Sequence, residues 1–112
     1  MKFPKFIIKK STNDQFYFNL WSKDEAIVLK SEMYTTKQNC KNGIESVKTN
    51  APLDKNYDRK MSDNSKYYFV LKSQNNGQII GTSNMYPNAS DRDTAIESVK
   101  IDAPIAETED LS

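Results

Sequence analysis

The residue types that most often carry chemistry in proteins are scarce in this sequence. Its 112 residues include no histidine and a single cysteine, Cys40. Histidine is the commonest general base and metal ligand, and no other side chain has an unperturbed pKa between about 5 and 8. There is also no phosphate-binding glycine loop, no set of cysteines at metal-ligand spacing and no recognisable catalytic triad. We therefore expect no enzymatic activity, no metal site and no cofactor.

Cys40 is the one candidate nucleophile. A nucleophilic cysteine needs a lowered pKa and a nearby base. Cys40, Ile44 and Val47 instead follow one another at spacings of four and three, which predicts that all three lie on one buried helix face. Arg92 takes the corresponding place in the second half of the chain. We predict a buried, unreactive thiol.

A carboxylate beside a hydroxyl occurs twice, as Glu45-Ser46 and Glu97-Ser98. Adjacent residues of a helix do not face each other, so the pair is poorly placed for catalysis. Glu45 also lies four positions after Lys41 and three before Lys48, a spacing that suits surface ion pairs. We predict a structural role for both pairs.

These pairs belong to an internal duplication. Residues 43–48, Gly-Ile-Glu-Ser-Val-Lys, return 52 positions later as Ala-Ile-Glu-Ser-Val-Lys, and each copy precedes an Ala-Pro step. Five consecutive identities at this spacing indicate two copies of one structural unit. We expect a single domain of two repeats, about 3–55 and about 56–107, with residues 108–112 forming a frayed acidic tail.

Charge and composition restrict the classes of partner and location. Sixteen basic and fifteen acidic side chains give a net charge of +1, which supplies no global field for nucleic acid or an anionic membrane. One cysteine forms no internal disulfide, and the first ten residues contain too short an apolar run for a signal peptide or a membrane span. We expect a cytoplasmic protein without a membrane partner.

Each repeat contains three strand-like segments followed by one helical segment. The strand segments are rich in β-branched and aromatic residues and are separated by turn formers. They cover residues 6–10, 16–21, 26–30, 57–61, 67–72 and 78–82. Each helix should end near Asn50 or Asp102, because Asn tolerates a left-handed cap and a proline follows. Its N-cap should be Thr35 or Thr36 in the first repeat, and Asn88 or Ser90 in the second.

The periodicity of these segments assigns side chains to the two faces of the sheet. The predicted core consists of Phe16, Phe18, Leu20, Cys40, Ile44, Val47, Tyr67, Phe69, Leu71, Ile96 and Val99. The opposite strand positions should form an open sheet face with Tyr17, Asn19, Trp21, Tyr68, Val70 and Lys72. On the helices, Gly43 with Ser46, and Ala95 with Ser98, form small flanks. We expect these flanks to face each other about a pseudo-twofold axis.

Residues 34–37 and 40–51 after a β-meander, with residues 71–72 and 76–80 of the second repeat, resemble the YegP-like family of small bacterial proteins. The resemblance extends to about residue 105. It implies an α+β fold of two tandem β(3)-α-β repeats, which share one antiparallel sheet with both helices on one face. It further implies that the C-terminal strands of the repeats, residues 51–55 and 103–107, are exchanged. The resemblance implies no catalytic residues.

The open sheet face is the main candidate for a function. Aromatic side chains on such a face can anchor a protein partner or stack on nucleic-acid bases. Our first hypothesis is a non-enzymatic module that binds a protein, which could be a second copy of itself. The alternatives are weak single-stranded nucleic-acid binding on the same face and, last, an enzyme that works without histidine. Tyr17, Trp21 and Tyr68 could also simply pack beneath neighbouring long side chains.

Overall fold

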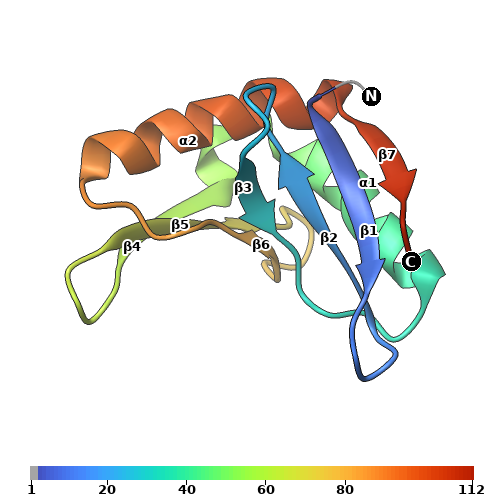
Figure 1. Ribbon diagram of the computed structural model, residues 1–112. Helices are drawn as coiled ribbons and strands as arrows, with labels where there is room; N and C mark the ends of the chain where they lie inside the picture. Colours follow the sequence, from blue (N-terminus) through green and yellow to red (C-terminus); the bar gives the residue numbers. More distant parts are fainter. Residues whose placement is uncertain (1–2) are drawn as a thin grey trace.

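The computed structural model describes residues 3–112. Within these residues, seven strands form one sheet, and two helices pack against one face of it (Figure 1). The strands are β1 (Lys5–Lys10), β2 (Phe16–Trp21), β3 (Ile27–Lys30), β4 (Tyr57–Met61), β5 (Tyr67–Lys72), β6 (Ile79–Thr82) and β7 (Glu107–Asp110). The helices are α1 (Lys37–Asn50) and α2 (Ala89–Asp102), each followed by a short 3-10 turn, η1 (Asp54–Asn56) and η2 (Ala103–Ile105). The structure confirms the α+β class and the tandem arrangement of the repeats.

The strand order is β4-β5-β6-β3-β2-β1-β7. Each repeat contributes one antiparallel meander, and the two meanders meet where Lys30 of β3 pairs with Thr82 of β6. A pseudo-twofold axis therefore passes between these two central strands. β7 lies parallel to β1, so the sheet is mixed rather than fully antiparallel.

Both helices begin and end where the sequence predicts, but neither expected stop signal is present. Thr36 Oγ1 accepts a hydrogen bond from Asn39 N at 3.0 Å, and Asn88 Oδ1 accepts one from Asp91 N at 2.8 Å, so these residues are the N-caps. The helices end at Asn50 and Asp102. The left-handed cap was wrong, because Asn50 and Asp102 are the last helical residues and neither has a positive φ. The expected effect of the proline was wrong as well, because the alanine before it keeps right-handed helical angles, with φ near −60° in each repeat.

The residues predicted for the core meet between the sheet and the helices. Phe18, Leu20, Phe69, Leu71, Cys40, Ile44, Val47, Ile96 and Val99 are all buried in one cluster. Phe16 and Tyr67 are only half-buried, because each is the first residue of its strand. Phe16 packs at the edge of the cluster, whereas the Tyr67 ring lies beneath the Arg92 guanidinium at 5.4 Å. Each is bridged there to the tyrosine that precedes the helix of its repeat, Tyr34 or Tyr86.

The strand exchange occurs once and at other residues than expected. Residues 51–55 form no strand, since the chain passes through a turn and η1 directly into β4. After α2 the chain forms η2, and only then pairs β7 with β1 of the first repeat. Residues 108–110 of the expected tail belong to this strand. Two ion pairs hold it, Lys5 Nζ to Glu109 Oε1 at 2.6 Å and Lys37 Nζ to Asp110 Oδ2 at 2.9 Å.

The small residue Gly43 does not face the second helix. A Cβ atom on Gly43 would overlap the hydroxyl of Tyr34 and lie 2.8 Å from its ring carbon Cζ and 3.2 Å from Phe18 Cε2. The missing side chain therefore makes room for Tyr34 of the same repeat. The expected packing of the two small helix flanks against each other was wrong at this position.

Each helix end instead holds a turn of the other repeat. Asn50 Oδ1, at the end of α1, accepts a hydrogen bond from Gln74 N in the β5–β6 turn at 2.9 Å. Asp102 Oδ2, at the end of α2, accepts one from Lys23 N in the β2–β3 turn at 3.1 Å. Both side chains are buried. The two repeats are thus connected by equivalent polar contacts as well as by the shared core.

Candidate binding surfaces

The open sheet face, the face opposite the helices, carries one continuous row of side chains across all seven strands. The register of the strand pairs gives the row as Asp58, Val70, Thr82, Lys30, Asn19, Ile7 and Glu109. Ile7 and Val70 are nearly buried although no helix covers this side. Neighbouring long side chains therefore shield the middle of the face from solvent.

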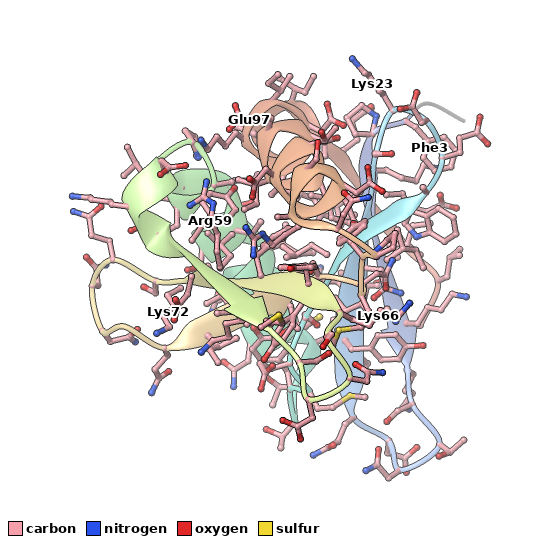
Figure 2. All side chains as sticks on the ribbon, turned by 90° about the vertical axis from the view of Figure 1, so that its left-hand side faces the viewer. Phe3, Lys23, Arg59, Lys66, Lys72 and Glu97 are labelled. Carbon is pink, nitrogen blue, oxygen red and sulfur yellow. The ribbon has the colours of Figure 1, made fainter. Side chains whose placement is uncertain are left out.

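The six predicted binding residues lie on this face but do not form one cluster. Tyr17, Asn19, Trp21, Tyr68 and Lys72 are half-buried, whereas Val70 is only 3 % exposed. Val70 is therefore part of the protein's own packing and offers almost no contact area. β2 and β5, which carry the tyrosines, are separated by β3 and β6. Figure 2 shows Lys72 of β5 and Phe3, which contacts Trp21 of β2, on opposite sides of the molecule.

Trp21 is held by its neighbours at the β1 end of the sheet. Its ring packs at a centroid distance of 6.1 Å against Phe3. Lys5, its partner across the strands, is buried and lies with Nζ 4.9 Å from the Phe3 ring centre. These contacts favour a structural role for Trp21.

Each tyrosine of the open face lies directly opposite a lysine of the neighbouring strand. Lys9 pairs with Tyr17, and Lys60 pairs with Tyr68 at the corresponding place of the second repeat. An aromatic ring beside a cation can bind an anionic or aromatic partner. The sheet therefore presents two equivalent tyrosine–lysine pairs rather than one aromatic patch.

The charges of the open face are sorted by strand. By strand alternation, the five inner strands direct Lys5, Lys9, Lys30 and Lys72 outward and no carboxylate. The outward carboxylates, Asp58, Glu107 and Glu109, belong to the edge strands β4 and β7. Within the described residues, Lys9 and Lys30 have no carboxylate oxygen within 4 Å. The middle of the face is therefore positively charged, although the whole chain is nearly neutral.

Asp58 balances part of this charge at the β4 edge. Its Oδ2 lies 3.2 Å from Lys72 Nζ and 3.6 Å from Lys60 Nζ. The hydrogen bond from Lys72, with help from the charge of Lys60, holds the pKa of Asp58 below its usual value. Lys72 is thus engaged with Asp58, which leaves Lys9 and Lys30 as the cations most open to a partner.

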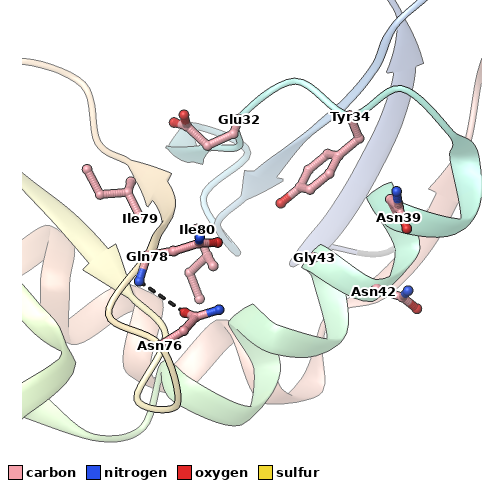
Figure 3. A pocket seen from close by; sticks show the side chains of 9 residues that line it. All are labelled: Glu32, Tyr34, Asn39, Asn42, Gly43, Asn76, Gln78, Ile79 and Ile80. Atoms are coloured by element: carbon pink, nitrogen blue, oxygen red, sulfur yellow. Dashed lines mark hydrogen bonds between the residues drawn. The ribbon is translucent and has the colours of Figure 1, made fainter.

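A second candidate surface is a cleft of about 620 Å³ between α1 and the β5–β6 hairpin, here named the α1 cleft. The first repeat contributes one wall, made of Glu32, Tyr34, Asn39, Asn42 and Gly43. The second repeat contributes the other wall, made of Asn76, Gln78, Ile79 and Ile80. Figure 3 shows Tyr34 and Gln78 pointing toward each other across the space, with Asn76 below them.

An equivalent cleft of about 410 Å³, the α2 cleft, lies between α2 and the β2–β3 hairpin. Tyr86, Ala95 and Val28 line it at the places that Tyr34, Gly43 and Ile80 have in the α1 cleft. Its chemistry differs, since Asp24 and Asp91 stand where the α1 cleft has Asn76 and Asn39. The two clefts share one frame, but the α2 cleft is the more acidic.

Comparison with known proteins shows the family to which this chain belongs. The model described as "Domain of unknown function (DUF1508)" matches residues 11–58 and again residues 62–110. The chain belongs to the DUF1508 family. Two matches in tandem agree with the duplication in the sequence and with the two halves of the sheet.

Two curated relatives of this DUF1508 protein show how far the similarity extends. A UPF0339 protein of Shewanella oneidensis is 44 % identical over 105 residues, which are 94 % of each chain. The UPF0339 protein YegP of Escherichia coli K12 is 44 % identical over 95 residues, which are 85 % of this chain and 86 % of the relative. Both are bacterial, and the similarity spans both repeats.

Solved structures of relatives have the same architecture. The solution structure of a UPF0339 protein from Shewanella oneidensis aligns with a TM-score of 0.89 at 43 % identity, covering 96 % of this chain and 90 % of that one. The solution structure of yegP from E. coli, described as a protein of unknown function, aligns with a TM-score of 0.91 at 39 % identity and covers 99 % and 95 %. The fold of this DUF1508 protein is therefore that of its relatives over nearly the whole chain.

Cys40 of the DUF1508 protein is fully buried. Burial, together with the negative charge of Asp110, raises the pKa of its thiol to about 11. A thiol with this pKa is protonated at neutral pH and is a poor nucleophile. Within residues 3–112, no three His, Cys, Asp or Glu side chains are grouped as metal ligands would be, and no helix has the length and apolarity to span a membrane.

The two clefts of the DUF1508 protein could not be predicted from the sequence. Their walls come from different repeats, and only the three-dimensional packing brings residues 32–43 beside residues 76–80. The Asn76-Gly77 step was correctly seen as a turn, but a turn signal says nothing about which helix lies next to it. The recurrence of Tyr34 and Tyr86 before each helix was the one available clue.

Proposed function

We propose that this DUF1508 protein is a cytoplasmic, non-enzymatic interaction module that binds an acidic protein surface through its open sheet face. The observation that carries the proposal is the sorting of charge on this face. Lys9 and Lys30 extend from inner strands without a carboxylate nearby among the described residues, and the outward acids are confined to the edge strands. A positive centre of this kind attracts and orients a negatively charged partner.

The two tyrosine–lysine pairs give such a partner contact area as well as charge. Tyrosine is among the residues that contribute most to binding energy at protein interfaces. Tyr17 beside Lys9 and Tyr68 beside Lys60 lie at equivalent places of the two repeats. Asp58 Oδ2 lies 3.6 Å from Lys60 Nζ, so the Tyr17–Lys9 pair is the more positive of the two and is the first contact for an acidic partner.

The absence of enzymatic activity is part of the proposal. Its support is the sequence without histidine and the buried Cys40, whose raised pKa keeps the thiol protonated. An activity screen on the purified chain would contradict the proposal if one conservative carboxylate substitution removed a measured turnover.

The test compares two variants that carry the same change of charge. Lys9→Glu with Lys30→Glu reverses the open sheet face, whereas Lys41→Glu with Lys48→Glu reverses two lysines of α1 on the helix side. Tagged proteins are used to capture partners from the native cell, and the captured protein is then purified and titrated. We expect the first variant to lose at least about tenfold in affinity and the control to match the wild type.

Equal capture by both variants would contradict the proposal, and so would a purified partner whose affinity ignores Lys9 and Lys30. Light scattering on the isolated chain distinguishes self-association, which would appear as a doubled mass that the face variant abolishes. These measurements separate a foreign partner from a second copy of the chain.

Single-stranded nucleic acid is the second candidate ligand, and the tyrosine–lysine pairs are the feature that favours it. Stacking on an aromatic ring beside a cation is how many proteins hold such strands. Oligonucleotides at low salt should then quench the fluorescence of Trp21, with an affinity that falls steeply as salt is added. No change in fluorescence with any oligonucleotide would exclude this alternative.

A further inference from the structure

We propose that the α1 cleft binds a small uncharged saccharide, with the hydroxyl of Tyr34 and the carboxamides of Asn76 and Gln78 as the groups that recognise it. This site is separate from the open sheet face, because it lies beside α1 on the helix side of the sheet. It therefore goes beyond the proposed function.

The α1 cleft is a built feature of the fold rather than a gap between surface side chains. The α2 cleft lies at the pseudo-equivalent position and has tyrosine in the same place. In each case one wall comes from the helix of one repeat and the other from the hairpin of the other repeat. A single repeat has only one of the two walls, so the cleft depends on the tandem arrangement.

Tyr34 is held at the edge of the α1 cleft with its hydroxyl available. Its ring stacks on Phe18 at a centroid distance of 6.4 Å and an interplanar angle of 10°. Gly43 leaves the space in which the hydroxyl lies against α1. Among the described residues, this hydroxyl has no hydrogen-bond partner, unlike that of Tyr57, which donates to Ala51 O at 2.7 Å. Burial raises the pKa of Tyr34, so its hydroxyl keeps its proton and can donate to a ligand.

The opposite wall supplies groups that both donate and accept. Asn76 Oδ1 already accepts from Gln78 N at 3.0 Å, which fixes this carboxamide and leaves its Nδ2 as a donor (Figure 3). The Gln78 side chain carries a further donor and acceptor. Vicinal hydroxyls of a sugar have the same dual character. Ile79 and Ile80 belong to the same wall, and the exposed Ile79 gives most of the apolar surface for the C–H face of a ring.

The charge of the cleft selects against other small ligands. Glu32 is the one ionisable acid among the described lining residues, and they include no lysine or arginine. A phosphorylated or carboxylated ligand would find no cation here and would meet this carboxylate. The volume of about 620 Å³ lies within the range of small-molecule sites.

An extended peptide is the competing ligand for the α1 cleft. Peptides that lie along a sheet gain most of their affinity by pairing with a free strand edge. β6 pairs with β5 from Ile79 to Thr82, but with β3 only at Thr82. The saccharide proposal therefore rests on the side chains of Tyr34, Asn76 and Gln78, and its test includes a peptide probe.

The test is a titration of the isotope-labelled full chain with glucose, galactose, mannose and N-acetylglucosamine, followed by NMR. The side-chain amide signals of Asn76 and Gln78 report on the site directly. We expect one of these sugars to shift both signals in a saturable manner. Tyr34→Phe and Gln78→Met should each weaken binding at least tenfold. Tyr86→Phe, the same change in the α2 cleft, should leave binding unchanged.

Several results would overturn the proposal. One is that no sugar shifts the Asn76 and Gln78 signals. Another is equal binding by Tyr34→Phe and Tyr86→Phe. A third is that glycylglycine amide, added as a peptide probe, shifts the two signals as strongly as any sugar. Each variant is first checked for a native spectrum, and Gln78→Met, at an exposed turn, keeps the test valid should Tyr34→Phe fail to fold.

Discussion

The contacts between each helix end and the turn of the other repeat make a sharp test of how the two halves are joined. In Asn50→Ala, Gln74 N loses its acceptor at 2.9 Å and the buried Asn56 Nδ2 loses one at 3.1 Å. The Asn50 Nδ2 donor to Ser46 O, at 2.8 Å, is lost as well. Because this site is only 6 % exposed, water does not easily replace these partners.

The expected cost follows from the number of bonds. A net contribution of about 1 kcal/mol per hydrogen bond, with a further cost for buried donors left unpaired, gives about 2 to 4 kcal/mol for Asn50→Ala. A domain of this size is stable by about 5 to 15 kcal/mol, so the loss is large. It corresponds to a fall of roughly 8 to 16 °C in the unfolding temperature.

Asp102 offers a matched pair of changes in the second repeat. Asp102→Ala removes the acceptor of Lys23 N at 3.1 Å and of Ser98 Oγ at 3.3 Å, and should cost about 2 kcal/mol. Asp102→Asn keeps an acceptor and removes a buried charge that has no cation within 4 Å among the described residues. Since Asn50 naturally fills the equivalent place, we expect Asp102→Asn to change the free energy of unfolding by less than about 1 kcal/mol.

Thermal denaturation measures these costs, and amide hydrogen exchange shows where they act. Asn50→Ala should speed exchange at Gln74 N and leave Lys23 N unchanged, whereas Asp102→Ala should do the reverse. The reasoning is refuted if both turns respond equally to either change, or if Asn50→Ala leaves the unfolding temperature within 2 °C of the wild type.

Three further predictions, two substitutions and one labelling experiment, concern other parts of the protein. Gly43→Ala should lower the free energy of unfolding by about 1 to 3 kcal/mol in denaturant titrations, because its Cβ would overlap Tyr34; an unchanged midpoint would contradict this packing. Cys40 should react with a thiol reagent at pH 7 only as fast as the protein opens, since burial raises its pKa to about 11, and rapid labelling of the native protein would disprove this. Hydrogen bonds from Arg59 and Lys100 lower the pKa of Asp54 to about 2, so its stabilising effect is complete above its unfolded value near 4 and is lost as the pH falls toward 2. Asp54→Asn should therefore flatten the fall of the unfolding temperature across this acid range, and parallel curves for wild type and variant would argue against the pairing.

The local structure of each repeat could be predicted from the sequence because local signals dominate it. β2, β4 and β5 have the predicted bounds, and Thr36 and Asn88 cap their helices as expected. Periodicity also separated the buried strand face from the open one. These features depend on alternation, turn residues and capping groups within a few positions of each other.

Turn conformations were less visible in the sequence. Of the described residues with positive φ, only Gly77 is a glycine, while Asp14, Glu25 and Ser65 adopt φ near 62° to 63°. A search for glycine identifies one of these positions and passes over the other three. The hydrogen bonds of each turn, such as Glu25 N to Ser22 O at 2.9 Å, stabilise a conformation that the residue type alone disfavours.

The contacts between the two repeats could not be predicted from the sequence. The role of Gly43 was misassigned because helical spacing shows that a flank is small without showing what lies against it. The same holds for Asn50 and Asp102, which looked like local helix stops and prove to reach the other repeat. The α1 cleft is a third case, since residues more than thirty positions apart line it together.

The two ends of the sheet explain why the exchanged strand occurs only once. After α1 the chain must enter β4 at once, so no segment remains to pair alongside it, whereas after α2 it can continue to β1. The charges reinforce this choice. Where β7 pairs with β1, Glu109 of β7 lies opposite Ile7 and forms an ion pair with Lys5.

On β4 the pairing of Tyr57 with Leu71 matches that of Phe6 with Leu20, so Asp58 stands in the place of Ile7. An acidic strand docked there in the same register would set Glu109 against Asp58 and would have no equivalent of Lys5. Like charges in this position are destabilising. Asp58, Arg59 and Lys60 make β4 a highly charged edge strand. Charged residues on an edge strand discourage the addition of another strand. The protein thus covers β1 with β7, which makes the acidic β7 one edge of the sheet and the charged β4 the other. Charges on both edge strands discourage strand addition, which directs any partner toward the faces of the sheet rather than its edges.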